Sequence, residues 1–110
     1  MFFAEEEGTT VGLVGGYRDI EDDTVVELIA MWVAPSWRRR GVAALLVEAV
    51  CDWASETGAH SVALWVTSGN APAAALYRAL GFVETGELQP LPSDPSKDEV
   101  RLARRLTRTT

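Results

Sequence analysis

The sequence contains few of the residues that hold metal ions or form covalent enzyme intermediates. Its 110 residues include one cysteine, Cys51, and one histidine, His60. A single cysteine cannot close an internal disulfide, which fits a reducing cytoplasm. These two residues are also too few for a zinc site or a cysteine–histidine nucleophile pair. We therefore expect no metal site, and we expect Cys51, which lies among apolar residues at helical spacing, in the core.

Long hydrophobic runs and an excess of positive charge are missing as well. No apolar stretch approaches the ~20 residues that span a bilayer, and the N-terminus has no basic region of the kind that opens a signal peptide. The formal net charge of -6 disfavours a general nucleic-acid binder, because affinity for phosphates comes mainly from positive charge. These features predict a cytoplasmic protein without a nucleic-acid or membrane partner, and they are compatible with an amine substrate.

The length and the pattern of elements predict a single domain over residues 1–110 with an α/β (α+β) fold. The expected strands are 1–6, 11–17, 24–33, 61–66, 83–87 and 99–106, and the expected helices are about 41–56 and 72–80. The proline-rich segment 87–98 is expected to be a loop. Strand–helix–strand order in the centre implies parallel pairing, and the terminal hairpins imply antiparallel pairing. We therefore expect a mixed, mostly antiparallel sheet with a central parallel strand pair and helices on its faces.

A cationic segment that contains a glycine follows the long strand expected at 24–33. Arg38, Arg39, Arg40 and Gly41 stand just before the expected helix. Backbone N–H groups at a helix start have no partner within the helix, and the helix dipole adds partial positive charge there. A pyrophosphate suits this position, and Gly41 would let the backbone approach it closely. The alternative is a loop whose arginines are simply solvated.

A second block of residues supports the first of these two interpretations, the pyrophosphate site. The string NAPAAALYRALGF, from Asn70 to Phe82, follows another apolar run. Together with WVAPSWRRRGVAALL it resembles the GNAT superfamily of acyl-CoA-dependent N-acyltransferases. Arg38, Gly41 and Ala43 match that family's acyl-CoA motif, Gln/Arg-x-x-Gly-x-Gly/Ala, and the second string matches its pantetheine and tyrosine block. The resemblance is close over residues 11–82.

The resemblance implies acetyl-CoA as cosubstrate and a set of residues that bind it. The backbone N–H of Met31 would polarise the thioester carbonyl, and Val33 would pair with the pantetheine arm as another strand would. Such pairing requires the strands 24–33 and 61–66 to diverge at their C-terminal ends. Asn70 either hydrogen-bonds the pantetheine amides or caps the following helix. The full expected set is Met31, Val33, Arg38, Arg39, Arg40, Gly41, Val42, Ala43, Ala44, Asn70 and Ala73.

Two residues are candidates for the chemistry. The resemblance places the family's tyrosine at Tyr77, whose phenol is neutral at physiological pH and can donate a proton to a departing thiolate. The alternative for Tyr77 is packing alone. Glu27 stands where one branch of the family carries a glutamate that acts as a base, often through water. Burial would raise the pKa of such a carboxylate, whereas a solvated carboxylate at the sheet edge is the alternative.

The resemblance implies transfer of an acetyl group from acetyl-CoA to an amine acceptor by direct attack in a ternary complex. A catalytically silent acyl-CoA-binding or regulatory module is the alternative from another class. Small amines, amino acids, antibiotics and protein N-termini all remain open as acceptors. GNAT domains usually open with a strand and one or two helices before the first hairpin, and this chain starts at the hairpin. We therefore expect an uncovered edge or face near residues 1–14, and either a homodimer through it or a shortened form of a longer protein.

Overall fold

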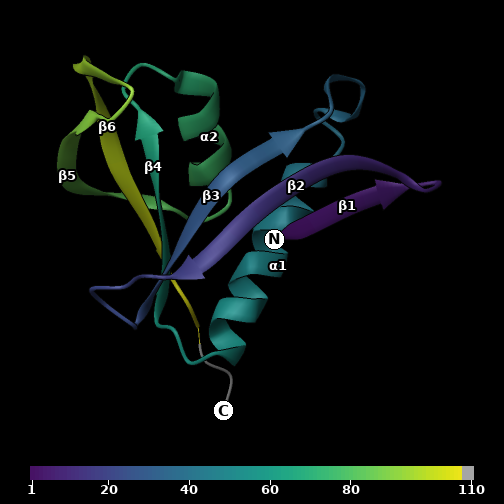
Figure 1. Cartoon of the computed structure of the whole chain (residues 1–110), viewed down its shortest axis with the longest axis horizontal. Coiled ribbons are helices and arrows are strands. Elements are labelled where there is room, and N and C mark those ends of the chain that lie inside the picture. The colour runs from purple at the N-terminus through teal and green to yellow at the C-terminus, as the bar shows by residue number, and fades with distance from the viewer. Residues whose placement is uncertain (108–110) are drawn as a thin grey trace.

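The computed structural model describes residues 1–107 as one mixed sheet with two helices (Figure 1). The elements in chain order are β1 (Phe2–Glu6), β2 (Thr9–Arg18), β3 (Val25–Val33), the 3-10 turn η1 (Pro35–Trp37), α1 (Val42–Glu56), β4 (Ser61–Thr67), α2 (Ala71–Ala79), β5 (Val83–Leu91) and β6 (Asp94–Arg105). The strand order in the sheet is β1-β2-β3-β4-β6-β5, in which β3 and β4 are parallel and every other neighbouring pair is antiparallel. The predicted mixed sheet with a central parallel pair is confirmed.

A bulge interrupts β3 in its second half. The register with β2 shifts between Leu13 and Gly15, so that two residues of β3, Ala30 and Met31, face one residue of β2. Ala30 has a φ of 57°, in the left-handed region that residues with a Cβ rarely adopt. A bulge of this kind bends its strand and increases the local twist. The end of β3 therefore runs in a different direction from the start of the strand.

The two parallel strands separate after a short ladder. Residues 25–27 of β3 pair with residues 61–63 of β4, and within residues 1–107 the ladder between these strands goes no further. Figure 1 shows β3 and β4 close together at their starts and well apart at their arrowheads. The divergence predicted for these two strands is confirmed, and it opens the sheet at the carboxyl ends of the parallel pair.

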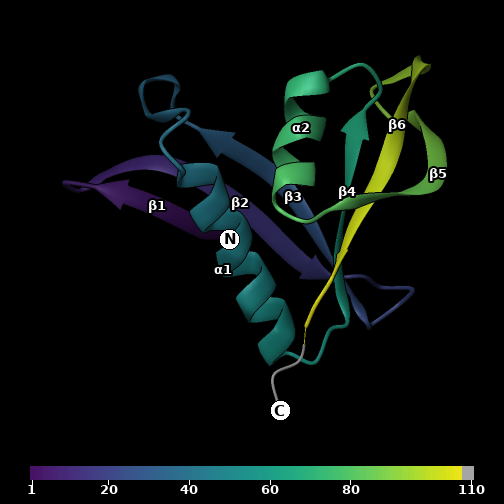
Figure 2. The same ribbon diagram turned by 180° about the vertical axis from the view of Figure 1, so that it is seen from behind.

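Helix α1 covers one face of the sheet beside this opening (Figure 2). Its buried residues, Val42, Leu46, Val47, Val50, Cys51 and Ala54, recur at steps of three or four, as the sequence predicted. A Cβ on Gly12 of β2 would lie 2.9 Å from Cγ1 of Val42. Only a residue without a side chain at Gly12 therefore lets the first turn of α1 lie this close to the sheet, which fixes where α1 begins relative to β3.

The opposite face of β1–β3 carries apolar side chains that remain accessible. Phe3 pairs with Leu13, and Leu13 pairs with Trp32, so the three share one face, on which Ile29 also lies. Phe3, Ile29 and Trp32 are exposed. Within the described part of the chain, β1 pairs with β2 alone. This surface corresponds to the uncovered edge and face expected near residues 1–14.

The loop predicted over residues 87–98 is wrong. Strands β5 and β6 continue through most of this segment as an antiparallel hairpin, with Leu91 opposite Asp94. Proline is tolerated here because β5 is an edge strand, where a residue without an N–H costs no hydrogen bond on the open side. Pro90 pairs in register with Asp98, and the register then shifts before Leu91. Pro90 therefore marks a bulge in an edge strand, whereas Pro92 lies in the turn of the hairpin and Pro95 near the start of β6. The other boundaries differ from the prediction by a few residues.

A buried ion pair joins β3 to β6 across β4. Arg101 donates from Nη1 to Oε1 of Glu27 over 2.6 Å and from Nη2 to Oε2 over 2.5 Å. The exposed fractions of the two side chains are 12% for Arg101 and 8% for Glu27. The guanidinium also lies 4.9 Å from the ring centroid of Trp65, on β4. The hydrogen bonds to Glu27 raise the pKa of Arg101 above its usual value. The pair lies at the last residue of β3 that still pairs with β4.

Arg101→Met is expected to lower the free energy of unfolding by about 3–5 kcal/mol, because it leaves the buried Glu27 carboxylate without a compensating charge. The double variant Glu27→Gln/Arg101→Met should recover most of that loss, since no isolated charge is left. Urea unfolding measures both. Arg78→Met is the matched control, because its pair with Glu84 is more than half exposed and should contribute at most about 1 kcal/mol. Equal losses for the two arginines would contradict the structural role given to the buried pair.

Candidate active site

Two cavities adjoin at the opening between β3 and β4. The central cleft, of about 660 Å³, lies between the diverging strands and is lined on its polar and aromatic side by Tyr17, Glu27, Trp65, Asn70, Tyr77 and Glu99. The loop groove, of about 410 Å³, runs along the start of α1. Met31 lines both cavities. An elongated ligand could therefore extend from the start of α1, past the bulge in β3, into the centre of the sheet.

The loop groove ends at the open N-terminus of α1. Gly41 is the N-cap residue, with a φ of 82°, and in the described structure neither a capping side chain nor an acidic residue occupies the first turn. A Cβ on Gly41 would have no atom of residues 1–107 within 4 Å apart from those of Gly41 and its two chain neighbours. The first backbone N–H groups of α1 thus face open space with the positive end of the helix dipole behind them, which is an arrangement that binds phosphate.

The three arginines take different positions around this groove. Arg38 and Arg39 line it, and Arg38 Nε donates to the carbonyl oxygen of Val33 over 3.1 Å. Arg40 instead lies over the ring of Trp37, with 5.0 Å between Cζ and the ring centroid. The groove brings together most of the predicted cofactor residues: Met31, Val33, Arg38, Arg39, Gly41, Val42, Ala43 and Ala44. Arg40 is the predicted residue of the loop that does not line it.

Asn70 and Ala73 lie in the central cleft, across from β3. Asn70 Oδ1 accepts a hydrogen bond from the backbone N–H of Ala73 over 3.2 Å, so Asn70 caps α2. Pro72 stands in the first turn, where its missing N–H costs nothing. The capping alternative for Asn70 is thus observed. Its side-chain NH₂ group is not used by the cap, which leaves a donor at the cleft.

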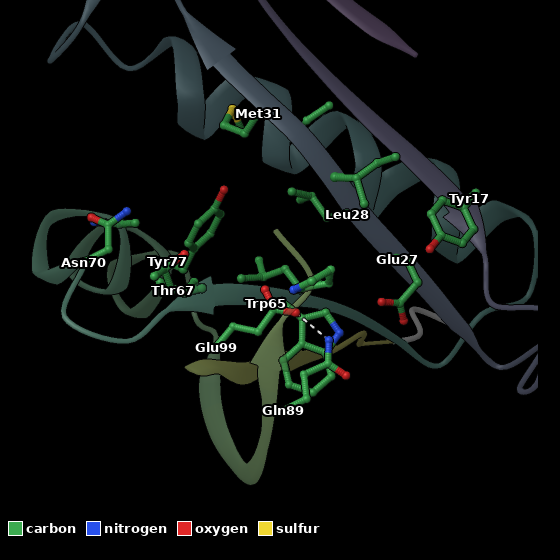
Figure 3. Close-up of a pocket in the computed structure, with 16 residues that line it drawn as sticks. Tyr17, Glu27, Leu28, Met31, Trp65, Thr67, Asn70, Tyr77, Gln89 and Glu99 are labelled. Atoms are coloured by element: carbon green, nitrogen blue, oxygen red, sulfur yellow. Dashed lines mark hydrogen bonds between the residues drawn. The ribbon is translucent and has the colours of Figure 1, made fainter. Parts of the chain in front are cut away.

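Tyr77 projects from α2 into the central cleft. Only 7% of the residue is exposed, and its ring packs edge to face against Phe82 with 5.7 Å between centroids. Figure 3 shows its hydroxyl directed towards β3, on the side where Met31 lies. Burial raises the pKa of Tyr77, so its phenol is a neutral hydrogen-bond donor at pH 7. The ring of Tyr77 is therefore packed, and its hydroxyl also has a position suited to proton donation.

Glu27 also lines the cleft, but its carboxylate is already engaged. It is buried rather than solvated, with 6% of the residue exposed, and both oxygens accept hydrogen bonds from Arg101. The expected basic role of Glu27 therefore depends on a residue that the sequence analysis did not connect with it.

Sequence reasoning missed the side of the cleft formed by β5 and β6. Glu99 is buried in the cleft, with 8% of the residue exposed, and it accepts a hydrogen bond from Gln89 Nε2 (Figure 3). Gln89 fell in the segment predicted to be a loop, so no strand register linked it to Glu99. Glu99 and Arg101 are two residues apart on β6, so their side chains lie on the same face of the sheet. This spacing was the signal in the sequence that could have placed Glu99 near the cleft.

Cys51 lies in the core on α1, as predicted. Burial raises the pKa of its thiol to about 11, so the reactive thiolate is scarce at neutral pH. Among residues 1–107 no group of three or more histidine, cysteine, aspartate or glutamate side chains is placed to hold a metal ion. Within the same described residues, no helix has the length and apolar character needed to cross a membrane.

Known proteins share both the sequence pattern and the fold. An N-acetyltransferase of Methanocaldococcus jannaschii is 33% identical over 88 residues, which are 76% of this chain and 39% of that protein. Aminoglycoside N(6')-acetyltransferase type 1 of Salmonella typhimurium is 31% identical over 90 residues, which are 76% of this chain and 62% of that enzyme. The chain thus spans less than two thirds of either relative.

A solved structure extends the comparison to the fold. The YncA protein of Salmonella typhimurium, solved with its cofactor acetyl-CoA, superposes with a TM-score of 0.80 at 23% identity over 98% of this chain and 65% of its own. The family model of the acetyltransferase (GNAT) family matches residues 1–82. Because this match covers more than half of the chain and includes β3, α1 and α2, the chain belongs to the GNAT family of acetyltransferases.

Proposed function

We propose that the chain is an N-acetyltransferase that moves an acetyl group from acetyl-CoA to an amine acceptor by direct attack in a ternary complex. The observation that carries the proposal is the junction of the loop groove and the central cleft at Met31. This junction would bring a thioester held along β3 next to Tyr77 and to the space where an acceptor can enter. Membership of the GNAT family and the acetyl-CoA bound to YncA support it.

The loop groove fits the pyrophosphate and the start of the pantetheine arm. The N–H groups of Val42, Ala43 and Ala44 would donate to the phosphates, and Arg38 and Arg39 would add charge-assisted hydrogen bonds. The open space at Gly41, where a side chain would stand, supports this placement. In this proposal Arg40, which lies over Trp37, contributes long-range attraction only.

The end of β3 and the start of α2 would hold the rest of the arm. Residues 31–33 no longer pair with β4, so their backbone N–H groups on that side would bond a pantetheine amide as a neighbouring strand would, beside the Val33 carbonyl oxygen that accepts from Arg38. Asn70 and Ala73 face them across the cleft. The Asn70 amide N–H groups can donate to a pantetheine carbonyl while Oδ1 caps α2.

The reaction requires a polarised carbonyl, a neutral amine and a proton for the leaving thiolate. The backbone N–H of Met31 would donate to the carbonyl oxygen as the amine nitrogen forms its bond to carbon and the carbon–sulfur bond breaks. Tyr77 would then give its proton to the thiolate, and Glu27, acting through water, would accept the proton that the amine loses. The raised pKa of Tyr77 supports its part, because the phenol is protonated over the whole neutral range.

The same proposal includes the acceptor, the cellular location and the assembly of the protein. The Salmonella relative is named for acetylation of an aminoglycoside, which supports an amine acceptor for this chain. We place the protein in the cytoplasm, where acetyl-CoA and reduced thiols occur together. The exposed apolar face of Phe3, Ile29 and Trp32 supports association with a second copy or with further chain.

Gly41→Val is expected to weaken CoA binding at least about 10-fold, because a branched side chain would occupy the space proposed for the phosphates. Gly8→Val is the matched control: Gly8 also has a left-handed φ, of 80°, and an open Cβ position, but it lies in the β1–β2 turn. Both variants should lose similar stability from backbone strain, roughly 1–2 kcal/mol. Calorimetric titration with CoA separates them, and equal affinities would contradict the proposed phosphate site.

Release of free thiol from acetyl-CoA, measured across a panel of amines with a no-amine control, tests the activity itself. Tyr77→Phe should keep CoA affinity and lower kcat by about 10²–10⁴-fold, because the ring contacts survive and the proton donor is lost. The alkaline fall in the parent's activity should lie above pH 10, the ordinary phenol pKa, and should vanish in the variant. CoA binding without turnover of any amine would support the silent module, and unchanged kcat would leave Tyr77 with a packing role only.

A further inference from the structure

The Glu99 carboxylate has one oxygen committed and one oxygen open. Oε1 accepts from Gln89 Nε2, and Oε2 has no hydrogen-bond partner among residues 1–107. No fully enclosed side-chain oxygen or nitrogen in that part of the chain lacks a partner. Oε2 must therefore reach solvent, and because Glu99 is more than nine-tenths buried and lines the central cleft, it does so inside the cleft.

Glu99 also takes part in no ion pair among residues 1–107. Glu27 and Glu99 are the two carboxylates that line the cleft, and no arginine or lysine is among the lining residues that the structure describes. The charge of Glu27 is balanced by Arg101, whereas the partner of Glu99 is the neutral amide of Gln89. Glu99 therefore brings to the cleft a carboxylate without an ion-pair partner among residues 1–107, in surroundings where partial desolvation strengthens electrostatic attraction.

Glu99 is held in place rather than free to swing. It lies on β6 opposite Thr67 of β4 and in register with Gln89 of β5, so two strands fix its backbone and the Gln89 amide fixes its side chain. Figure 3 shows its carboxylate directed into the cleft between Tyr77 on one side and Glu27 on the other. A carboxylate positioned in this way is prepared to accept a hydrogen bond from a ligand at one defined place.

We infer that Glu99 Oε2 binds a second ammonium group of the acceptor, so that the chain selects organic cations with two or more amines, such as diamines, polyamines and aminosugars. One amine is acetylated beside Tyr77, and the other pairs with Glu99. Gln89 acts as a positioning residue because it orients the carboxylate through Oε1 and leaves Oε2 for the ligand. This inference rests on the proposed acetyltransferase function and adds to it the class of acceptor.

The test compares cadaverine with n-pentylamine, which have the same carbon chain and differ by one ammonium group. The parent should show the higher kcat/KM for cadaverine. Glu99→Gln should lower that value by about 10- to 100-fold, the loss expected for one charge-assisted hydrogen bond, mainly through KM. The value for n-pentylamine should change by less than about 2-fold, because this amine does not use the carboxylate. Glutamine at this position can still accept from Gln89.

Two further variants separate this role from general effects. Glu87→Gln removes one negative charge from an exposed position of β5 and should leave the cadaverine preference intact, because a solvated charge is screened. Glu99→Asp keeps the charge on a shorter side chain and should retain part of the preference. It also tests the inference if Glu99→Gln does not fold, which urea unfolding would reveal. Equal loss in Glu87→Gln and Glu99→Gln would overturn a specific role for Glu99.

The outcomes distinguish this inference from the function on which it rests. If the parent acetylates both amines equally well, or if Glu99→Gln slows both equally, the inference is wrong and the acetyltransferase proposal stands. If no amine is acetylated, the proposed function fails, and calorimetric titration of cadaverine into the CoA-bound protein decides the inference. Binding by the parent that is lost in Glu99→Gln supports a cation site, and no binding by the parent overturns it.

Discussion

The bulge in β3 is the constraint on which the rest of the structure depends. Two residues, Ala30 and Met31, stand opposite one residue of β2, and Ala30 adopts a left-handed conformation that costs of the order of 1–3 kcal/mol. β3 leaves β4 after Glu27, and the bulge that follows turns the end of β3 further from its first direction. Residues 31–33 therefore lie apart from β4, with backbone N–H groups that a ligand could bond. The strained residue therefore lies where the structure gains its cleft.

Such an opening removes hydrogen bonds from the centre of the sheet, so other contacts must hold the two halves together. Helix α1 packs across β1, β2, β3 and β4 on one face, and Gly12 lets its first turn approach the sheet closely. On the other face the Glu27–Arg101 pair joins β3 to β6 at the point of divergence. The same pair engages one of the two carboxylates in the cleft, while Glu99 has no ion-pair partner among residues 1–107.

Local sequence patterns were sufficient for most of the fold. The spacing of apolar residues in α1, the β-branched runs of β3 and β4, and the turn residues gave element types and a mixed sheet that the structure confirms. The loop groove was also predictable, because Arg38, Gly41 and Ala43 are neighbours in sequence. The β5–β6 hairpin was not, since prolines in an edge strand and prolines in a loop look alike without knowledge of the strand order.

The parts of the fold and the site that the sequence did not predict depend on contacts between segments that are far apart in the sequence. Arg101 is 74 residues from Glu27 in sequence, and no local pattern links them. The pairing of Gln89 with Glu99 depends on the register of a hairpin that was expected to be a loop. The predicted site was therefore most complete where it is built from one continuous segment and least complete on the acceptor side, where β3, β4, β5 and β6 each contribute side chains.

We propose that the opened end of β3 and the start of α1 together form one binding site for acetyl-CoA. Amide hydrogen exchange with and without CoA tests it directly, because these backbone N–H groups are the proposed donors. Slower exchange is expected at Met31 and Val33 on β3 and at Val42, Ala43 and Ala44 on α1 when CoA is bound. Exchange that is unchanged at these residues under saturating CoA, or slowed only in β5 and β6, would contradict the account.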